Sequence, residues 1–292
     1  MIPNKERIAL VTSQAHPALT EDDQLIVAPL RDLGFDVQAE VWDSKSARWG
    51  EYDCCIIRST WDYHVRSQEF QAWLRSLSRQ GVTLLNPVDV LLWNMHKGYL
   101  GELATKGIQV IETHLVKKGE DRDFAPAFAM NMQGDVVIKP AVSATAHQTY
   151  RIRRGELDRH RDKMNSILER TDVLVQPFVE DVQSVGEWSF IFFGETFSHA
   201  VLKKPRDGDY RSQSEFGGQI VSITPTSDMI DEASSVVQTM TSSLLYARVD
   251  AIPVDGHLAI VEFEVLEPAL FFQNDSAAAG RFARRLWELM KA

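Results

Sequence analysis

The chain has 292 residues and a mass of 33.1 kDa, enough to bury a sizeable core divided into two or three lobes around a cleft. Its formal net charge of −10 argues against nucleic-acid or anionic-membrane partners, because these need a basic face. No stretch approaches the roughly 20 apolar residues that cross a bilayer, and the N-terminal segment reads as a first β-strand, not a signal peptide, so we expect a cytoplasmic protein.

The first part of the chain alternates between short apolar runs and amphipathic segments. This alternation is typical of a parallel sheet flanked by helices. We therefore predict an N-terminal, Rossmann-like α/β domain over residues 1–95. Its strands are expected at Ile8–Val11, Asp36–Val41, Cys54–Ile57 and Val82–Leu85, and its helices over 22–33 and 67–80. A further helix is expected over 86–103, across the boundary to the next unit.

The remainder of the chain reads as two further units. Residues 96–180 predict a small α+β lobe, with strands near 105–116, 135–139, 150–153 and 173–176 and a charged helix over 156–170. Residues 181–292 predict a C-terminal subdomain built on two hairpins. The first hairpin turns at Gly194, a helix covers 228–246, the second hairpin spans 248–268, and a last helix starts near 276.

The second hairpin carries a possible metal site. If its loop has three residues, Asp255 to His257, then Asp250 lies opposite Glu262. Glu264 projects from the same face as Glu262, because side chains alternate along a strand. Three converging carboxylates repel one another unless a cation neutralises them, and Mg²⁺ prefers carboxylate oxygens. The alternative is an ordinary solvated strand face.

Two lysines and a connector between lobes predict a nucleotide site. Lys139 ends an apolar strand and precedes a loop of small residues, where an ammonium and backbone N–H groups can hold phosphate. Lys97 lies near a lobe junction. The connector after Gln176 can present backbone groups to an adenine edge, and Glu187 can accept hydrogen bonds from ribose, with Glu180 as its rival. Solvated surface lysines and a strand-edge glutamate are the alternatives.

The order of these motifs resembles the ATP-grasp superfamily, which includes glutathione synthetase and D-alanine:D-alanine ligase. Asn86…Lys97, VIKP, QPF…GE and RVD…VEFEVLEP follow one another at about the spacing of that superfamily, over about two hundred residues. The strings RSTWDYH, LNPVDVLLWN, KGYL and EFEVLEPALFF resemble a narrower branch that includes the O-ureido-D-serine cyclo-ligase of cycloserine formation. The expected fold is therefore an ATP-grasp fold preceded by the α/β domain.

The resemblance also implies roles for individual residues. Lys97 and Lys139 would contact the phosphates of ATP. Gln176, Phe178 and Val179 would line the adenine pocket, with Lys139 nearby, and Glu187 would bind the ribose. Asp250, Glu262 and Glu264 would hold magnesium, with two ions expected. Glu264 departs from the asparagine of many members, and the loop after Lys139 has no glycine before Gly155, so its closure over phosphate is left open.

Substrate residues are predicted at the N-terminal sheet, because ligands of open α/β sheets collect beyond the carboxyl ends of strands. Arg58 and Thr60 follow such a strand and could clamp a carboxylate, with Asp62 or Glu267 facing its amino group. Arg211, in a polar loop, is the candidate for stabilising an acyl phosphate, and Lys203 for assisting at the triphosphate. A flexible surface arginine is the alternative for Arg211.

The resemblance implies an ATP- and magnesium-dependent ligase. A small, amino acid-like carboxylate would be activated as an acyl phosphate and attacked by a nitrogen nucleophile, by intramolecular cyclisation in the case of cycloserine formation. A small-molecule kinase on the same fold and a noncatalytic ATP-binding module are the alternatives. The sequence does not identify the acceptor, decide between intra- and intermolecular bond formation, or set the oligomeric state, and a homo-oligomer remains compatible with it.

Overall fold

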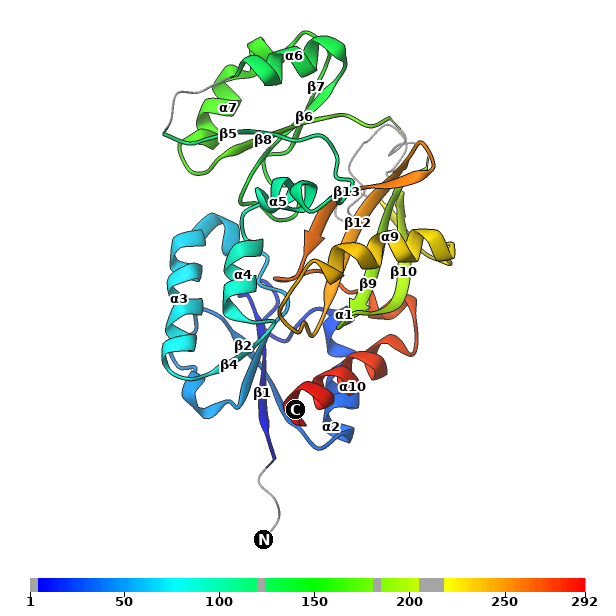
Figure 1. Ribbon diagram of the computed structural model, residues 1–292. Helices are drawn as coiled ribbons and strands as arrows, with labels where there is room; N and C mark the ends of the chain where they lie inside the picture. Colours follow the sequence, from blue (N-terminus) through cyan, green and yellow to red (C-terminus); the bar gives the residue numbers. More distant parts are fainter. Residues whose placement is uncertain (1–4, 120–123, 181–184, 205–217, 292) are drawn as a thin grey trace.

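The computed structural model describes residues 5–119, 124–180, 185–204 and 218–291, which form three β-sheets with helices packed on them (Figure 1). The N-terminal sheet is parallel, in the order β2-β1-β3-β4. Its strands are β1 (Arg7–Thr12), β2 (Asp36–Val41), β3 (Cys54–Ile57) and β4 (Thr83–Leu85). The predicted Rossmann-like arrangement is present.

Alternation along β1 divides the N-terminal core into two layers. Ile8 and Leu10 face the short helix α2 (Val27–Asp32), which follows α1 (Glu21–Gln24), and the C-terminal helix α10 (Ala278–Lys291). Ala9 and Val11 face the opposite layer. That layer consists of η1 (Trp49–Glu51), η2 (Tyr63–Arg66), α3 (Ser67–Arg79) and α4 (Val88–Asn94).

The small lobe, at the top of Figure 1, is an antiparallel sheet in the order β5-β8-β6-β7. Its core is formed between the sheet and the helices on it. The strands are β5 (His114–Val116), β6 (Val136–Pro140), β7 (Tyr150–Ile152) and β8 (Val173–Pro177), and the helices are α6 (Ala125–Gln133), η3 (Leu157–His160) and α7 (Arg161–Leu168). Helix α6 was not anticipated from the sequence.

The C-terminal sheet is antiparallel, in the order β11-β10-β9-β12-β13. One of its faces packs on α5 (Tyr99–Thr105) and α9 (Ser227–Gln238). The strands are β9 (Glu187–Phe193), β10 (Thr196–Lys204), β11 (Gln219–Ile223), β12 (Ala247–Val254) and β13 (His257–Glu264), followed by η5 (Phe272–Asn274). Strand β11 was not anticipated.

Several predicted helices are shorter than expected. The helix expected over 22–33 is divided into α1 and α2, and the one over 228–246 ends at Gln238. The helix over 86–103 is interrupted between Asn94 and Tyr99, where the N–H of Lys97 donates to the carbonyl of Ala141 at 2.8 Å. A tertiary hydrogen bond thus replaces an intrahelical one and brings Lys97 toward the small lobe.

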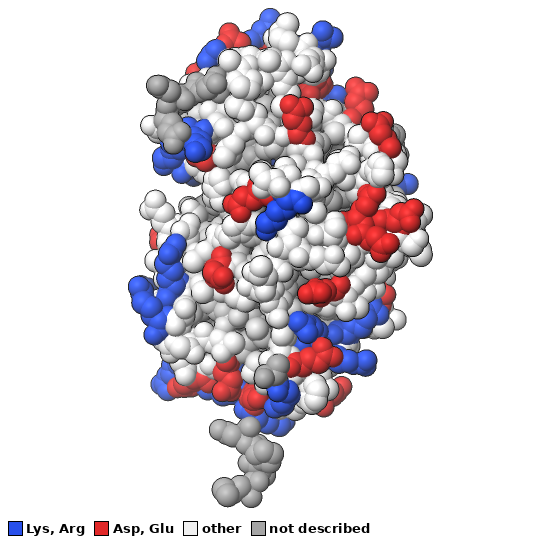
Figure 2. Space-filling view, viewed as in Figure 1, with Lys and Arg blue, Asp and Glu red and all other residues white. Residues whose placement is uncertain are grey.

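The distribution of charge on the surface agrees with the net negative charge of the chain. Figure 2 shows acidic and basic side chains interspersed over the visible face, without one large basic area among the described residues. In the described part of the chain, no helix combines the length and the apolar character that crossing a membrane requires.

Candidate active site

A cavity of about 300 Å³ lies between the N-terminal domain, the small lobe and the C-terminal sheet, and residues of all three units line it. Trp61 and Tyr63 come from the N-terminal domain, and Phe178 follows β8 of the small lobe. The predicted residues that line the cavity are Lys97, Lys139, Gln176, Phe178, Val179, Glu187, Lys203, Asp250, Glu262, Glu264 and Glu267. Most of the predicted site is therefore brought together in one place.

The β12–β13 hairpin supplies the acidic wall of the cavity. Val254 pairs with His257, so the turn contains only two residues, Asp255 and Gly256, both with positive φ (51° and 86°). The expected three-residue loop is wrong. An extra residue on β13, Val261, forms a bulge opposite Asp250 and Ala251 and shifts the register by one residue, which places Asp250 opposite Glu262 as predicted.

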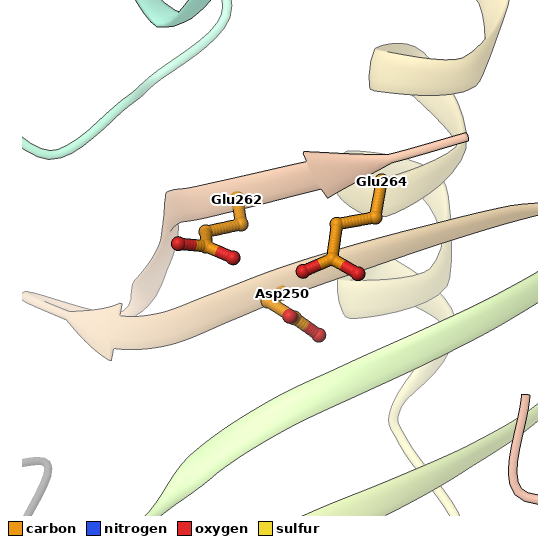
Figure 3. Close-up of side chains that lie close together, drawn as sticks. All are labelled: Asp250, Glu262 and Glu264. Carbon is orange, nitrogen blue, oxygen red and sulfur yellow. The ribbon is translucent and has the colours of Figure 1, made fainter. Parts of the chain in front are cut away.

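The carboxylates of Asp250, Glu262 and Glu264 converge (Figure 3), each offering an oxygen within 4.8 Å of the others. Burial raises the pKa of Glu264 well above its usual value, and the charges of Glu262 and Asp250 add to this despite the opposing effect of Arg248. One member of the cluster is thus driven toward its neutral form. Burial, and then repulsion between neighbouring carboxylates, disfavours the ionised form of such a group.

Three lysines balance the other carboxylates. The Nζ atom of Lys139 lies 3.1 Å from Oε1 of Glu262, and that of Lys97 lies 3.6 Å from the same atom. Lys203 pairs with Glu187 and lies 3.3 Å from Oδ2 of Asp250. Although burial opposes it, Lys97 and Lys139 hold the pKa of Glu262 well below its usual value.

Arg248 is a site residue that the sequence reasoning missed. Its Nη2 lies 2.8 Å from Oε1 of Glu264 and 3.0 Å from Oδ2 of Asp250. Burial opposes ionisation of Asp250, but Arg248 and Lys203 outweigh it and lower the pKa of that carboxyl. Arg248 lies two residues before Asp250 on β12, and side chains two residues apart project from the same strand face. The same alternation that aligns Glu262 with Glu264 could therefore have predicted Arg248 as a site residue.

The donor set fits magnesium. Three carboxylates that meet on one wall of a cavity supply the hard oxygen ligands that Mg²⁺ takes, and they leave room for water or phosphate oxygens on the cavity side. Lys97, Lys139 and Lys203 line the same cavity and offer ammonium groups to phosphate. An acidic cluster surrounded by cations is an arrangement suited to a metal–polyphosphate ligand.

The residues predicted to form an adenine pocket belong to the small lobe and line the cavity. Gln176 and Phe178 lie at the end of β8, and the guanidinium of Arg151 lies 3.6 Å from the centre of the Phe178 ring. The Gln176 amide donates to Oγ1 of Thr113 at 2.9 Å. Glu180 is exposed and does not line the cavity, whereas Glu187 does.

Three predicted substrate residues do not line the cavity. Arg58 is buried and paired with Asp23 at 2.8 Å. Thr60 is also buried, and Asp62 accepts from Trp42 and Arg66 in the N-terminal domain. These residues do follow the carboxyl end of β3, as predicted from their order along the chain. Their side chains, however, point into the N-terminal domain and not into the cavity. Glu267 does line the cavity, and Arg211 lies outside the described residues.

Comparison with known proteins yields relatives over the whole chain. A family model for the N-terminal domain of D-cycloserine synthetase DcsG matches residues 8–86. The cycloserine biosynthesis protein DcsG of Streptomyces lavendulae is 27% identical over 304 residues, which cover 97% of this chain and 99% of that protein. The crystal structure of D-cycloserine synthetase DcsG is similar with a TM-score of 0.87 and 25% identity, over 97% of this chain and 99% of that one.

More distant structures share the architecture. D-alanine–D-alanine ligase from Bacillus anthracis, complexed with ATP, has a TM-score of 0.70 at 15% identity, over 97% of this chain and 96% of that one. The ATP-grasp ligase PsnB, complexed with a minimal precursor, has a TM-score of 0.65 at 15% identity, over 98% of this chain and 99% of that one. The predicted ATP-grasp fold is confirmed.

Proposed function

We propose that this chain, a homologue of D-cycloserine synthetase with the ATP-grasp fold, is an ATP- and magnesium-dependent ligase that closes an amino acid-like substrate into a ring. Its homologues are ATP-grasp ligases that form C–N bonds. The observation that carries the proposal is the acidic cluster of Asp250, Glu262 and Glu264, which shares a cavity with three buried lysines.

The reaction would proceed in two steps. A substrate carboxylate oxygen attacks the γ-phosphorus of ATP, the bond to the β–γ bridging oxygen breaks, and an acyl phosphate and ADP form. A nitrogen of the same substrate then attacks the acyl carbon, loses a proton and expels phosphate with the bonding electrons. Magnesium would neutralise the polyphosphate and hold it in line for transfer.

The cavity residues match the charge that this reaction must stabilise. Lys97, Lys139 and Lys203 would exchange their carboxylate partners for phosphate oxygens once magnesium occupies the acidic cluster. Arg248, beside that cluster, would face the negative charge that develops on the acyl group. Val179 and Phe178 would form the adenine pocket with Gln176, and Glu187 would bind ribose.

A phosphate-release assay tests the proposal. We expect purified protein with ATP and Mg²⁺ to release phosphate when O-ureido-serine is added, and mass spectrometry to find the cyclised product. Lys139→Ala should lower the rate by about 100-fold or more, because one charge that stabilises the transition state is removed. Lys45→Ala, which alters an exposed lysine outside the cavity, should leave it unchanged.

Two results would favour the alternatives. A phosphorylated product without free phosphate would identify a kinase. ATP binding without turnover, over a panel of amino acids, dipeptides and O-ureido-serine, would identify a noncatalytic module.

A further inference from the structure

One carboxylate of the cavity differs from the rest in its partners. Asp250, Glu262, Glu264 and Glu187 each have a lysine or arginine nitrogen within 4.0 Å. Glu267 is only 8% exposed and lines the same cavity, yet no cation of the described residues lies within ion-pair distance of its carboxylate. A buried carboxylate without a cationic partner is costly, unless a ligand brings the missing charge.

The main chain around Glu267 is held in place. It belongs to an irregular segment, 265–271, between β13 and η5. Four consecutive carbonyls of this segment each accept a hydrogen bond from a side chain, at 2.8–3.1 Å. These bonds run from Tyr246 to Leu266, from Trp61 to Glu267, from Arg58 to Pro268 and from Arg248 to Ala269.

This anchoring gives Arg58 a role other than the one its sequence position suggested. Arg58 and Trp61 belong to the N-terminal domain, and both bind carbonyls of the segment that carries Glu267. The N-terminal domain therefore helps to fix the main chain from which this side chain enters the cavity. A carboxylate carried by so firmly held a main chain and left without a cation is suited to recognising a charged ligand group.

We propose that Glu267 is the acceptor for the ammonium group of the amino acid substrate, and that its carboxylate discriminates against a desamino analogue of that substrate. The inference rests on the proposed function for the choice of substrate class. Asp62, the other candidate from the sequence, lies outside the cavity and is occupied by Trp42 and Arg66.

The charges around Glu267 agree with an incoming cation. Burial raises the pKa of Glu267 to about 7, against the lowering effects of Lys97 and Arg248. An ammonium group placed beside the carboxylate would restore its ionised form, because an opposite charge within a few ångströms favours ionisation. Glu267 is not among the three converging carboxylates of the acidic cluster.

A binding experiment tests the inference. Isothermal titration calorimetry compares O-ureido-serine with its desamino analogue, 3-(ureidooxy)propanoate, in the presence of Mg²⁺ and a non-hydrolysable ATP analogue. Wild-type protein should bind the amino compound about 30-fold or more tightly, because a buried charge pair is made only with that ligand. Glu267→Gln, which keeps the shape and removes the charge, should bring the affinity ratio close to one.

Two further variants sharpen the result. Asp62→Asn should retain the wild-type ratio. Trp61→Phe, which removes the indole N–H that binds the Glu267 carbonyl together with part of the ring, should lower the ratio partly, as expected of a positioning residue. The inference is overturned if the ratio survives in Glu267→Gln, if wild-type protein binds both compounds equally, or if it binds neither. Turnover is not measured, so failure of the ligase proposal would appear separately in the phosphate-release assay.

Discussion

Arg248 contacts two of the three clustered carboxylates, so its guanidinium and a magnesium ion would share the same oxygen atoms. It lies opposite Glu264 across the hairpin and two residues before Asp250 on the same strand face. Such a cation stabilises the empty acidic cluster and competes with the metal for it. The two effects can be separated by measuring stability with and without magnesium.

We expect Arg248→Leu to lower the free energy of unfolding by about 3–5 kcal/mol without magnesium, because it leaves buried carboxylates without their cation. Magnesium should restore more stability in this variant than in wild-type protein. Thermal unfolding across a magnesium titration measures both. Arg284→Leu, at an exposed arginine of α10, is the matched control and should change neither. An equal magnesium response in wild type and Arg248→Leu would contradict the prediction.

Glu267 makes the stability of the unliganded protein depend on pH. Its pKa is about 7 in the folded protein against 4.5 for a free glutamate, so folding favours the protonated acid. Its contribution is complete below about pH 4.5 and is lost as the pH rises through 7. Glu267→Gln should therefore gain stability over wild type between pH 5 and 8, by up to about 3 kcal/mol. Urea unfolding at several pH values measures the difference, and parallel pH profiles would refute it.

At the scale of elements, the sequence was most informative where a local period decides the geometry. The period of two along β13 put Glu262 and Glu264 on one strand face. The pairing of Asp250 with Glu262 was predicted correctly only because the bulge offsets the one-residue error in the turn length. The break before Tyr99 and the burial of Arg58 depend on partners far along the chain, Ala141 and Asp23. No local pattern reveals such pairings, so neither was predicted.

Gly186 immediately precedes β9, which begins at Glu187. Its φ is +94°, and a Cβ atom there would lie 2.8 Å from the carbonyl oxygen of Lys203. Gly34 has a similar φ of +97° but open space around it. Replacement by alanine should cost about 1 kcal/mol at Gly34 from backbone strain alone, and roughly 2–4 kcal/mol at Gly186, where the clash adds to it.

The two glycine variants also separate stability from nucleotide binding. Because the clash displaces β9 from β10, Gly186→Ala should disturb the Glu187–Lys203 pair and weaken ATP binding, whereas Gly34→Ala should not. Urea unfolding and nucleotide titration measure the two effects. Equal losses of stability in both variants would show that the backbone at Lys203 moves away from the added Cβ atom without an energetic penalty.

At the scale of the whole molecule, the structural units do not coincide with the chain segments predicted from the sequence. Residues 96–180 were expected to form the small lobe, but α5 packs its Leu100 and Leu103 into the core of the C-terminal sheet. Helix α10, from the end of the chain, lies beside α2 and packs on the N-terminal sheet (Figure 1). Hydrophobic periodicity identified α10 as a helix but could not say which sheet it covers.

The position of α10 predicts how the molecule unfolds. Phe282 is fully buried in a cluster that contains Ile8 and Leu10 of β1 as well as Phe193 of β9. Because one side chain supports both sheets, Phe282→Ala should lower the free energy of unfolding by about 3–5 kcal/mol. In this variant the N-terminal and C-terminal sheets should still unfold together, in a single transition.

Trp287→Ala, on the same helix, is the matched control. This side chain is 43% exposed, so its removal should cost less than about 1 kcal/mol. Urea unfolding followed by far-ultraviolet circular dichroism measures the stability of both variants, and hydrogen exchange resolves the two sheets. If the N-terminal sheet of Phe282→Ala exchanged at a lower denaturant concentration than the C-terminal sheet, α10 would be stabilising one sheet and not joining the two.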